Sequence, residues 1–168
     1  MYLWSGFYVG ANIGGGWASA DHGFSGSGVV GGGQIGYNFQ NGHWVWGAEA
    51  DISGAGVNGN AMAGGRYGVD MASTLTGRLG YSVDRWLVYG KAGVGWVDVK
   101  SPLMGSDTAT GGAFGVGAEY ALGHNWSAKV EYDFIDVGSD AGLTGNTFQS
   151  VKAGVNYHFP VGFPIGKY

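Results

Sequence analysis

Eight stretches of this sequence alternate between apolar residues and small or polar ones, with a period of two. Along 126–134, for example, Trp126 and Val130 fall on one side, and Lys129 and Glu131 fall on the other. Successive side chains of a β-strand point to opposite faces, so this period predicts strands rather than helices. The eight stretches are 7–17, 29–39, 44–52, 74–82, 86–96, 114–122, 126–134 and 148–159. We therefore expect an all-β chain of eight strands.

The connectors between these stretches alternate between tight turns and longer loops. The expected tight turns are Asn41-Gly42, Val83-Asp84-Arg85 and Gly123-His124-Asn125, and the expected loops are 19–27, 54–67, 101–110 and 138–146. Asn-Gly is a strong signal for a hairpin turn, and runs rich in Gly, Ser, Asp, Asn and Thr are typical of loops. This order predicts antiparallel strands that run up and down. All tight turns and both chain termini then lie at one end, the turn end, and the longer loops lie at the other, the loop end.

Glycine and the scarcity of charge indicate which face of the strands points inward. Gly accounts for 37 of the 168 residues, and charged residues account for only 12%. A water-soluble β-sandwich turns a charged face to the solvent, whereas the polar face here is mostly Gly, Ser, Thr and Asn. Inside a narrow closed barrel, small residues leave room for the few long side chains beside them. The composition therefore favours a barrel whose apolar face points outward.

Aromatic residues gather near the two ends of the expected strands. At the turn end they are Phe7, Tyr37, Phe39, Trp44, Trp46, Tyr81, Trp86, Tyr120, Trp126, Tyr157 and Phe159, and at the loop end Trp17, Trp96, Phe114, Phe134 and Phe148. Two aromatic girdles around an aliphatic band are typical of a transmembrane barrel, because Trp and Tyr prefer the membrane interface. We predict an eight-stranded antiparallel up-and-down transmembrane β-barrel with short periplasmic turns and longer extracellular loops. Residues 1–168 form one domain, with the barrel at about 6–159 and a C-terminal extension at 160–168.

The inward face of the predicted barrel carries nine charged residues, which we call the lumen network. They are Glu49, Asp51, Arg78, Lys91, Glu119, Lys129, Glu131, Asp133 and Lys152. An eight-stranded barrel is just wide enough for side chains to fill, and unpaired charges inside it are costly. A set of four positive and five negative residues therefore predicts ion pairs that plug the lumen, with a proton or ion path as the alternative. We expect Arg78, Lys91, Glu49 and Glu119 to meet at similar depth.

The sequence gives little support for catalysis, metal binding or nucleic-acid binding. The pairs Glu49/Asp51 and Glu131/Asp133 each share a strand face, but the basic residues nearby favour structural pairing over acid–base catalysis. The chain has no Cys and no His-x-x-x-His spacing, and its net charge of −4 argues against nucleic acid. We expect no enzyme activity, no metal and no cofactor. The one histidine in an expected outer loop, His22, is the candidate for an alternative role in haem ligation.

Several runs resemble those of a known family. They are 4–17 (WSGFYVGANIGGGW), 77–81 (GRLGY) with 89–93 (YGKAG), 129–132 (KVEY) and 151–159 (VKAGVNYHF). They resemble the small outer-membrane immunogenic proteins of alphaproteobacteria, which are porin-family relatives of opacity-type surface antigens. The resemblance covers nearly the whole chain and implies an abundant, surface-exposed barrel in the Gram-negative cell envelope. Chains of this family usually end at the final Phe, which helps the assembly machinery recognise the last strand, whereas nine residues follow Phe159 here.

The leading interpretation is a structural barrel of the bacterial outer membrane that supports envelope integrity and displays its loops. The alternatives are a narrow pore for protons or very small solutes, and a haemin-binding or host-surface-binding protein acting through its loops. The expected partners are outer-membrane lipid, lipopolysaccharide and the barrel-assembly machinery, with host or neighbouring envelope proteins at the loops. Met1 is not followed by a basic start and an apolar run, so an exported chain is expected in its mature form.

Overall fold

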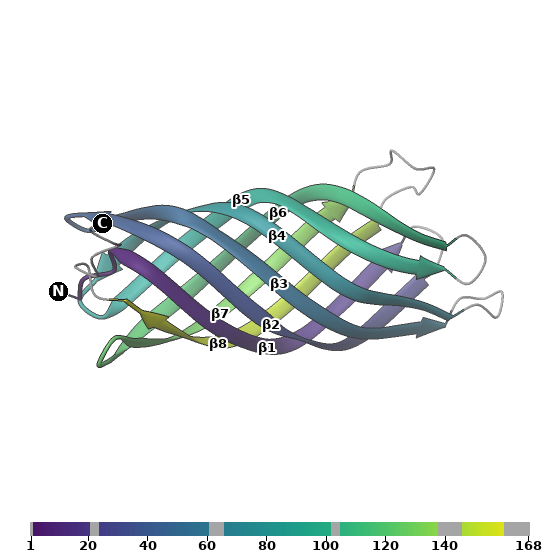
Figure 1. Cartoon of the computed structure of the whole chain (residues 1–168), viewed down its shortest axis with the longest axis horizontal. Coiled ribbons are helices and arrows are strands. Elements are labelled where there is room, and N and C mark those ends of the chain that lie inside the picture. The colour runs from purple at the N-terminus through teal and green to yellow at the C-terminus, as the bar shows by residue number, and fades with distance from the viewer. Residues whose placement is uncertain (1, 21–23, 61–65, 102–104, 138–145, 160–168) are drawn as a thin grey trace, which may run out of the picture.

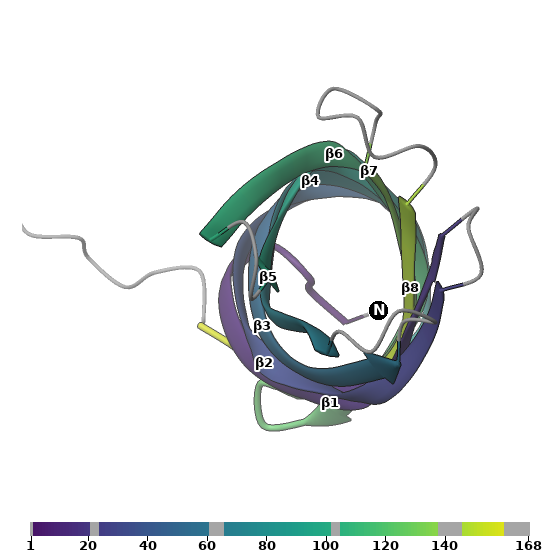
Figure 2. The same cartoon turned by 90° about the vertical axis from the view of Figure 1, so that its right-hand side faces the viewer.

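The chain folds into a closed barrel of eight antiparallel strands, each hydrogen-bonded to its neighbours in sequence (Figures 1 and 2). The computed structural model describes residues 2–20, 24–60, 66–101, 105–137 and 146–159. The strands are β1 (Gly6–Ala20), β2 (Phe24–Asn41), β3 (Trp44–Asn60), β4 (Arg66–Val83), β5 (Trp86–Ser101), β6 (Gly105–Gly123), β7 (Trp126–Val137) and β8 (Asn146–His158). Pairing of β1 with β8 closes the barrel. The predicted fold class is confirmed.

The strands are longer than the alternation predicted, ranging from 12 to 19 residues. Much of the expected loops 19–27, 54–67 and 101–110 belongs to strands, and most of 138–146 lies outside the described residues. The expected loop boundaries were wrong because these segments carry Gly, Ser and Asn instead of an apolar face. Their backbones continue the hydrogen-bonded ladder of their neighbours, and a ladder does not require apolar side chains.

Three tight turns join the strands at the turn end, and each is two residues long, at 42–43, 84–85 and 124–125. Gly42, Asp84, His124 and Asn125 have φ angles of 61°, 52°, 50° and 67°. Gly, Asn and Asp adopt this left-handed conformation most readily, which explains the Asn-Gly and Asp-Arg signals in the sequence. In Figure 1 these turns and the N-terminus lie at the same end of the barrel.

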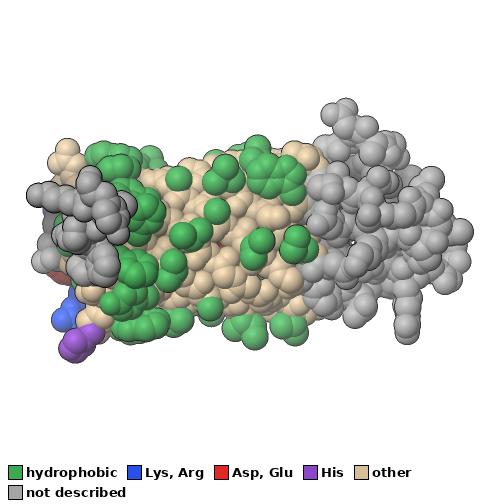
Figure 3. Space-filling model, viewed as in Figure 1, with side chains coloured by type: hydrophobic (Ala, Val, Ile, Leu, Met, Phe, Trp, Pro, Cys, Tyr) green, Lys and Arg blue, Asp and Glu red, His purple; other side chains and the backbone are tan. Residues whose placement is uncertain are grey.

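Apolar side chains cover the outside of the barrel, and polar ones point inward. Ile35 is 53% exposed, whereas its neighbour Gln34 is 4% exposed. Figure 3 shows hydrophobic side chains along the outer wall, most densely near the turn end. Over the described part of the chain, no helix is long and apolar enough to cross a bilayer.

One predicted girdle residue faces the other way. Phe148 is only 7% exposed and lies inside the lumen, beside Val30 and Ile135. Residues two apart share a strand face, and Ser150 and Lys152 also point inward from β8. The prediction was wrong for this residue because its aromatic character was given more weight than its place in the alternation.

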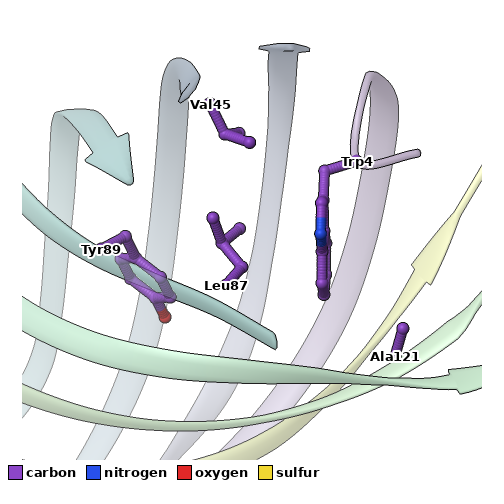
Figure 4. Packing of buried hydrophobic residues seen from close by; sticks show 5 residues of the cluster. All are labelled: Trp4, Val45, Leu87, Tyr89 and Ala121. Atoms are coloured by element: carbon purple, nitrogen blue, oxygen red, sulfur yellow. The ribbon is translucent and has the colours of Figure 1, made fainter. Parts of the chain in front are cut away.

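Two apolar layers enclose the polar middle of the lumen. At the turn end, Trp4, Val45, Leu87, Tyr89 and Ala121 pack together (Figure 4). Toward the loop end, Val30, Ala72, Ile135 and Phe148 line one small cavity next to the charged residues Asp51, Asp133 and Lys152. The charged groups are therefore buried between apolar side chains, where an unpaired charge is costly.

Candidate functional site: a charge network in the barrel lumen

All nine residues of the lumen network point inward and are buried. β3 supplies Glu49 and Asp51, and β7 supplies Lys129, Glu131 and Asp133, because residues two apart share a strand face. β4, β5, β6 and β8 each supply one further charged residue. Glycines on the same face keep the interior wide enough for these long side chains. A Cβ at Gly115, for example, would lie 2.7 Å from Asp133 Oδ1 and 2.8 Å from Lys91 Cε.

Arg78 occupies the part of the network nearest the turn end. Its Nη2 donates to Glu119 Oε2 at 2.9 Å, and its Nη1 lies 3.6 Å from Glu49 Oε2. Nη1 also donates to the Tyr8 hydroxyl at 2.9 Å. The guanidinium carbon sits 3.8 Å from the ring centroid of Tyr89, which is close enough for a cation–π contact. Arg78 thus has anionic, neutral polar and aromatic partners at once.

Lys91 and Lys129 bridge the acidic residues of β3 and β7. Lys91 Nζ lies 3.2 Å from Glu49 Oε1, 2.7 Å from Glu131 Oε1 and 3.0 Å from Asp133 Oδ1. Lys129 Nζ lies 3.3 Å from Glu131 Oε2 and 3.6 Å from Glu49 Oε2. Glu49 therefore contacts three different cations across the barrel.

Lys152 completes the network toward the loop end. Its Nζ lies 2.8 Å from Asp133 Oδ2 and 3.2 Å from Asp51 Oδ1. It also lies 4.0 Å from Glu131 Oε1, so the Arg78 and Lys152 ends are connected through shared carboxylates. The structure brings all nine predicted residues into one network, in which Arg78, Lys91, Glu49 and Glu119 are linked by direct contacts.

Polar residues that were not predicted complete this network. The Tyr8 hydroxyl donates to Glu49 Oε2 and the Tyr89 hydroxyl donates to Glu131 Oε2, each at 2.7 Å. Both tyrosines fall on the inward face of their strands in the period-two alternation. This alternation could have predicted their place in the lumen. Glu119 also accepts hydrogen bonds from Ser127 and from Asn156 Nδ2, the latter at 2.7 Å.

A chain of amides lies beside the charges. Asn12 Nδ2 donates to Gln34 Oε1, and Gln34 Nε2 donates to Asn156 Oδ1, both at 2.6 Å. Asn12 Nδ2 also donates to Asp51 Oδ2 at 2.9 Å. These bonds tie β1, β2, β3 and β8 to the same interior. They satisfy buried polar groups that would otherwise destabilise the barrel.

Residues before β1 close the lumen at the turn end. Trp4 is fully buried, and its Nε1 donates to Ser82 Oγ at 3.0 Å. Its backbone N donates to Gln40 Oε1 at 2.7 Å, and its ring packs edge-on against His158. In the end-on view of Figure 2 the N-terminus lies within the outline of the barrel. Partial burial, and after it the negative charge of Glu119, raises the pKa of the Tyr2 hydroxyl above its usual value.

The histidines and the metal-ligating residue types were also considered as candidate sites. Among the described residues, no group of three or more His, Cys, Asp or Glu side chains could hold a metal ion. His43 lies in the 42–43 turn, where its Nδ1 is 2.8 Å from the Ser82 carbonyl oxygen. His158 Nε2 contacts Glu119 Oε1 at 3.1 Å within the lumen. The haem candidate His22 lies outside the described residues.

The chain matches a known family over almost all of the barrel. A model of the outer membrane protein beta-barrel domain matches residues 2–159. The chain belongs to this outer-membrane β-barrel family. Its outward apolar face is therefore a lipid-facing surface, and the protein resides in the outer membrane.

Curated relatives of this outer-membrane barrel are named as immunogenic or outer-membrane proteins. The chain is 34% identical over 204 aligned positions to the 31 kDa outer-membrane immunogenic protein of Brucella melitensis, covering 94% of this chain and 85% of that one. It is 33% identical to the 22 kDa outer membrane protein of Rhizobium leguminosarum, covering 93% and 78%. The resemblance to outer-membrane immunogenic proteins is confirmed.

Solved structures show the same fold at lower sequence identity. Neisserial surface protein A superposes with a TM-score of 0.67 at 20% identity, over 92% of this barrel and 98% of that chain. Ail, the attachment invasion locus protein of Yersinia pestis, gives a TM-score of 0.61 at 16% identity, over 92% and 99%. At these identities the likeness shows the fold alone.

Proposed function

We propose that this outer-membrane protein acts as a sealed structural barrel and not as a pore. In this role it supports the integrity of the envelope and presents the loop-end connectors to the exterior. The observation that carries the proposal is the lumen network, in which every basic side chain contacts at least two acidic ones. A conducting lumen would need a continuous water path through this layer.

The energetics of buried charge support a seal. An ion that entered the lumen would have to displace partners that are already paired, and the displaced groups would be left as buried charges. Removing one partner from a buried ion pair costs about 3–5 kcal/mol, because the remaining charge is left uncompensated. The apolar layers on either side, which contain Trp4 and Phe148, further discourage water from entering.

The proposed partners follow from this arrangement. The outward apolar wall contacts membrane lipid, with lipopolysaccharide on the side of the loop end. The barrel-assembly machinery inserts the chain, and host or neighbouring envelope proteins contact the connectors. We propose no catalytic role, because the buried carboxylates are occupied by basic partners.

Conductance across a planar lipid bilayer tests the proposal. The parent barrel is expected to give no steady current, and Arg78→Ala is expected to introduce small, frequent openings. Arg85→Ala is the matched control, because it removes an exposed arginine in the 84–85 turn and leaves the lumen intact. Steady conductance by the parent barrel, together with unchanged stability of Arg78→Ala, would replace the seal with the pore alternative.

A further inference from the structure

Arg85 lies in the 84–85 turn, at the turn end of the barrel. Among the lysines and arginines whose exposure the structure describes, only Arg85 is exposed, while Arg78, Lys91, Lys129 and Lys152 are buried in the lumen. The Arg85 guanidinium makes no hydrogen bond or ion pair with any described residue. Figure 3 shows a basic side chain and a histidine at this end, next to the dense hydrophobic band. A guanidinium presents several hydrogen-bond donors and is well suited to bind a phosphate.

Arg85 borders an open cavity of about 640 Å³. Tyr2, Asp84, Trp86 and Tyr120 also line it. The Trp86 and Tyr120 rings lie 4.8 Å apart between centroids. Both rings belong to the turn-end girdle, at the level where lipid headgroups meet the hydrocarbon core. The cavity therefore combines a cationic donor with aromatic walls at headgroup depth.

A second cavity, an apolar groove of about 660 Å³, lies on the outer wall of the same strands. Outward-facing side chains of Leu79, Phe114 and Val116 line it, and the glycines Gly77 and Gly90 leave its floor open. A Cβ at Gly77 or Gly90 would approach no atom closer than 3.9 Å, and neither residue has a positive φ. The barrel therefore has no steric need for glycine at either position, and larger side chains there would fill the groove.

The two cavities line up along β5. Trp86 pairs with Tyr120 at the first cavity, and Gly90 pairs with Val116 at the groove. Ala92, which also lines the groove, lies six positions after Trp86, and six steps span about 20 Å along a strand. With the usual strand tilt, this is roughly 15 Å of depth, or half of the ~30 Å hydrocarbon core. A lipid of one leaflet has the reach to occupy both cavities.

We propose that one anionic glycerophospholipid binds over β4, β5 and β6, in the leaflet at the turn end. Its phosphate contacts Arg85 beside the packed rings of Trp86 and Tyr120, and one acyl chain lies in the groove over Gly77 and Gly90. The first cavity lies at the turn-end rim, where Ala121 and Tyr2 border it, and the groove lies on the outer wall. The proposal does not depend on whether the lumen conducts, because neither cavity contains a residue of the lumen network as a binding group.

Native mass spectrometry of the delipidated barrel in detergent tests this site, with phosphatidylglycerol and phosphatidylcholine as probes. The parent is expected to retain one phosphatidylglycerol more tightly than phosphatidylcholine. Arg85→Gln should weaken phosphatidylglycerol retention about fivefold, since one basic residue near a membrane surface contributes about that much. Asp84→Asn should strengthen it, because Asp84 is the acidic neighbour of Arg85 and its φ of 52° suits Asn.

A matched pair of glycine-to-leucine variants tests the groove proposed for the acyl chain. Gly90→Leu should weaken retention of both lipids, because leucine would occupy the groove. Gly15→Leu places the same side chain on the lipid-facing surface of β1, where a Cβ meets nothing within 4 Å, and should leave retention unchanged. Heat-modifiable gel migration verifies that each variant is folded.

Three results would overturn the proposal. The first is equal retention of the two lipids with no effect of Arg85→Gln. The second is a loss with Gly15→Leu as large as the loss with Gly90→Leu. The third is binding of soluble glycerol phosphate as tightly as phosphatidylglycerol, which would mean a phosphate site without a lipid.

Discussion

Arg78 and Tyr89 form the closest cation–π pair among the described residues, with the guanidinium carbon 3.8 Å from the ring centroid. The two residues come from the adjacent strands β4 and β5, and each also bonds a carboxylate on another strand. The pair therefore connects Glu119 on β6 with Glu131 on β7. It lies where the charged layer meets the apolar cluster around Trp4, so it shields the charges on the side of the turn end.

Removal of Arg78 is expected to destabilise the barrel strongly. Arg78→Ala leaves Glu119 and Glu49 short of a cation in a buried site, so we expect a loss of about 3–5 kcal/mol in the free energy of unfolding. Urea titration of the barrel in lipid vesicles, followed by tryptophan fluorescence, measures this loss. Asp136→Asn, which removes an exposed charge on β7, should change the same quantity by less than about 0.5 kcal/mol. Equal effects of the two variants would contradict a structural role for the network.

Tyr89 contributes through both its hydroxyl and its ring, and two variants separate these contributions. Tyr89→Phe removes the hydrogen bond to Glu131 but keeps the ring over Arg78, and we expect a loss of about 1.5–3 kcal/mol in unfolding free energy. Tyr89→Leu removes both contacts and should lose about 2 kcal/mol more. The same urea titration measures both values. If the phenylalanine and leucine variants were equally stable, the cation–π contact would contribute nothing.

Trp4 is expected to hold the N-terminal segment inside the barrel. Trp4→Ala removes a fully buried indole from the cluster with Leu87 and Val45, which should cost about 3–5 kcal/mol. Tyr2 should then become more accessible, because its ring packs on Trp4 at 4.8 Å between centroids. A lowered temperature of conversion from the folded to the unfolded gel band checks the first effect, and faster nitration of Tyr2 by tetranitromethane checks the second. Trp4→Phe keeps an aromatic ring and serves as the control, with a smaller change expected in both measurements.

Single cysteines test the assignment of faces, and the absence of native cysteine makes the labels unambiguous. Spin labels at Val9, Ile35 and Val130 should contact lipid, and those at Asn12, Gln34 and Glu131 should report the interior. Collision rates with oxygen and with a water-soluble nickel complex distinguish the two environments. Lipid contact by the second group would mean that the inward and outward faces are exchanged.

Cysteines also test the orientation in the outer membrane. Ala63→Cys, between β3 and β4, should react with an impermeant maleimide in intact cells, and His124→Cys, in the 124–125 turn, should react only after the outer membrane is opened. Labelling of His124→Cys alone in intact cells would invert the orientation that places the tight turns in the periplasm.

The sequence by itself determined the fold class, the number of strands and the inward direction of the nine charged residues. A period of two is a local property that each strand carries in its own residues, so no tertiary information was needed to recognise it. Val130 and Glu131, for instance, are assigned to opposite faces by their positions alone. Applied to every residue, the same rule places Tyr8, Tyr89 and Phe148 inward, although Phe148 was assigned to the interface because it is aromatic.

The tertiary structure decided which inward residues meet and where the strands end. Contacts such as Lys152 with Asp51 depend on the stagger of strands around the closed barrel, which no single strand encodes. The loop-end extensions of the strands depend on pairing with a neighbour, because a backbone ladder can form without an apolar face. The insertion of Trp4 depends on the width of the turn-end opening, which exists only once β1 and β8 have closed the barrel.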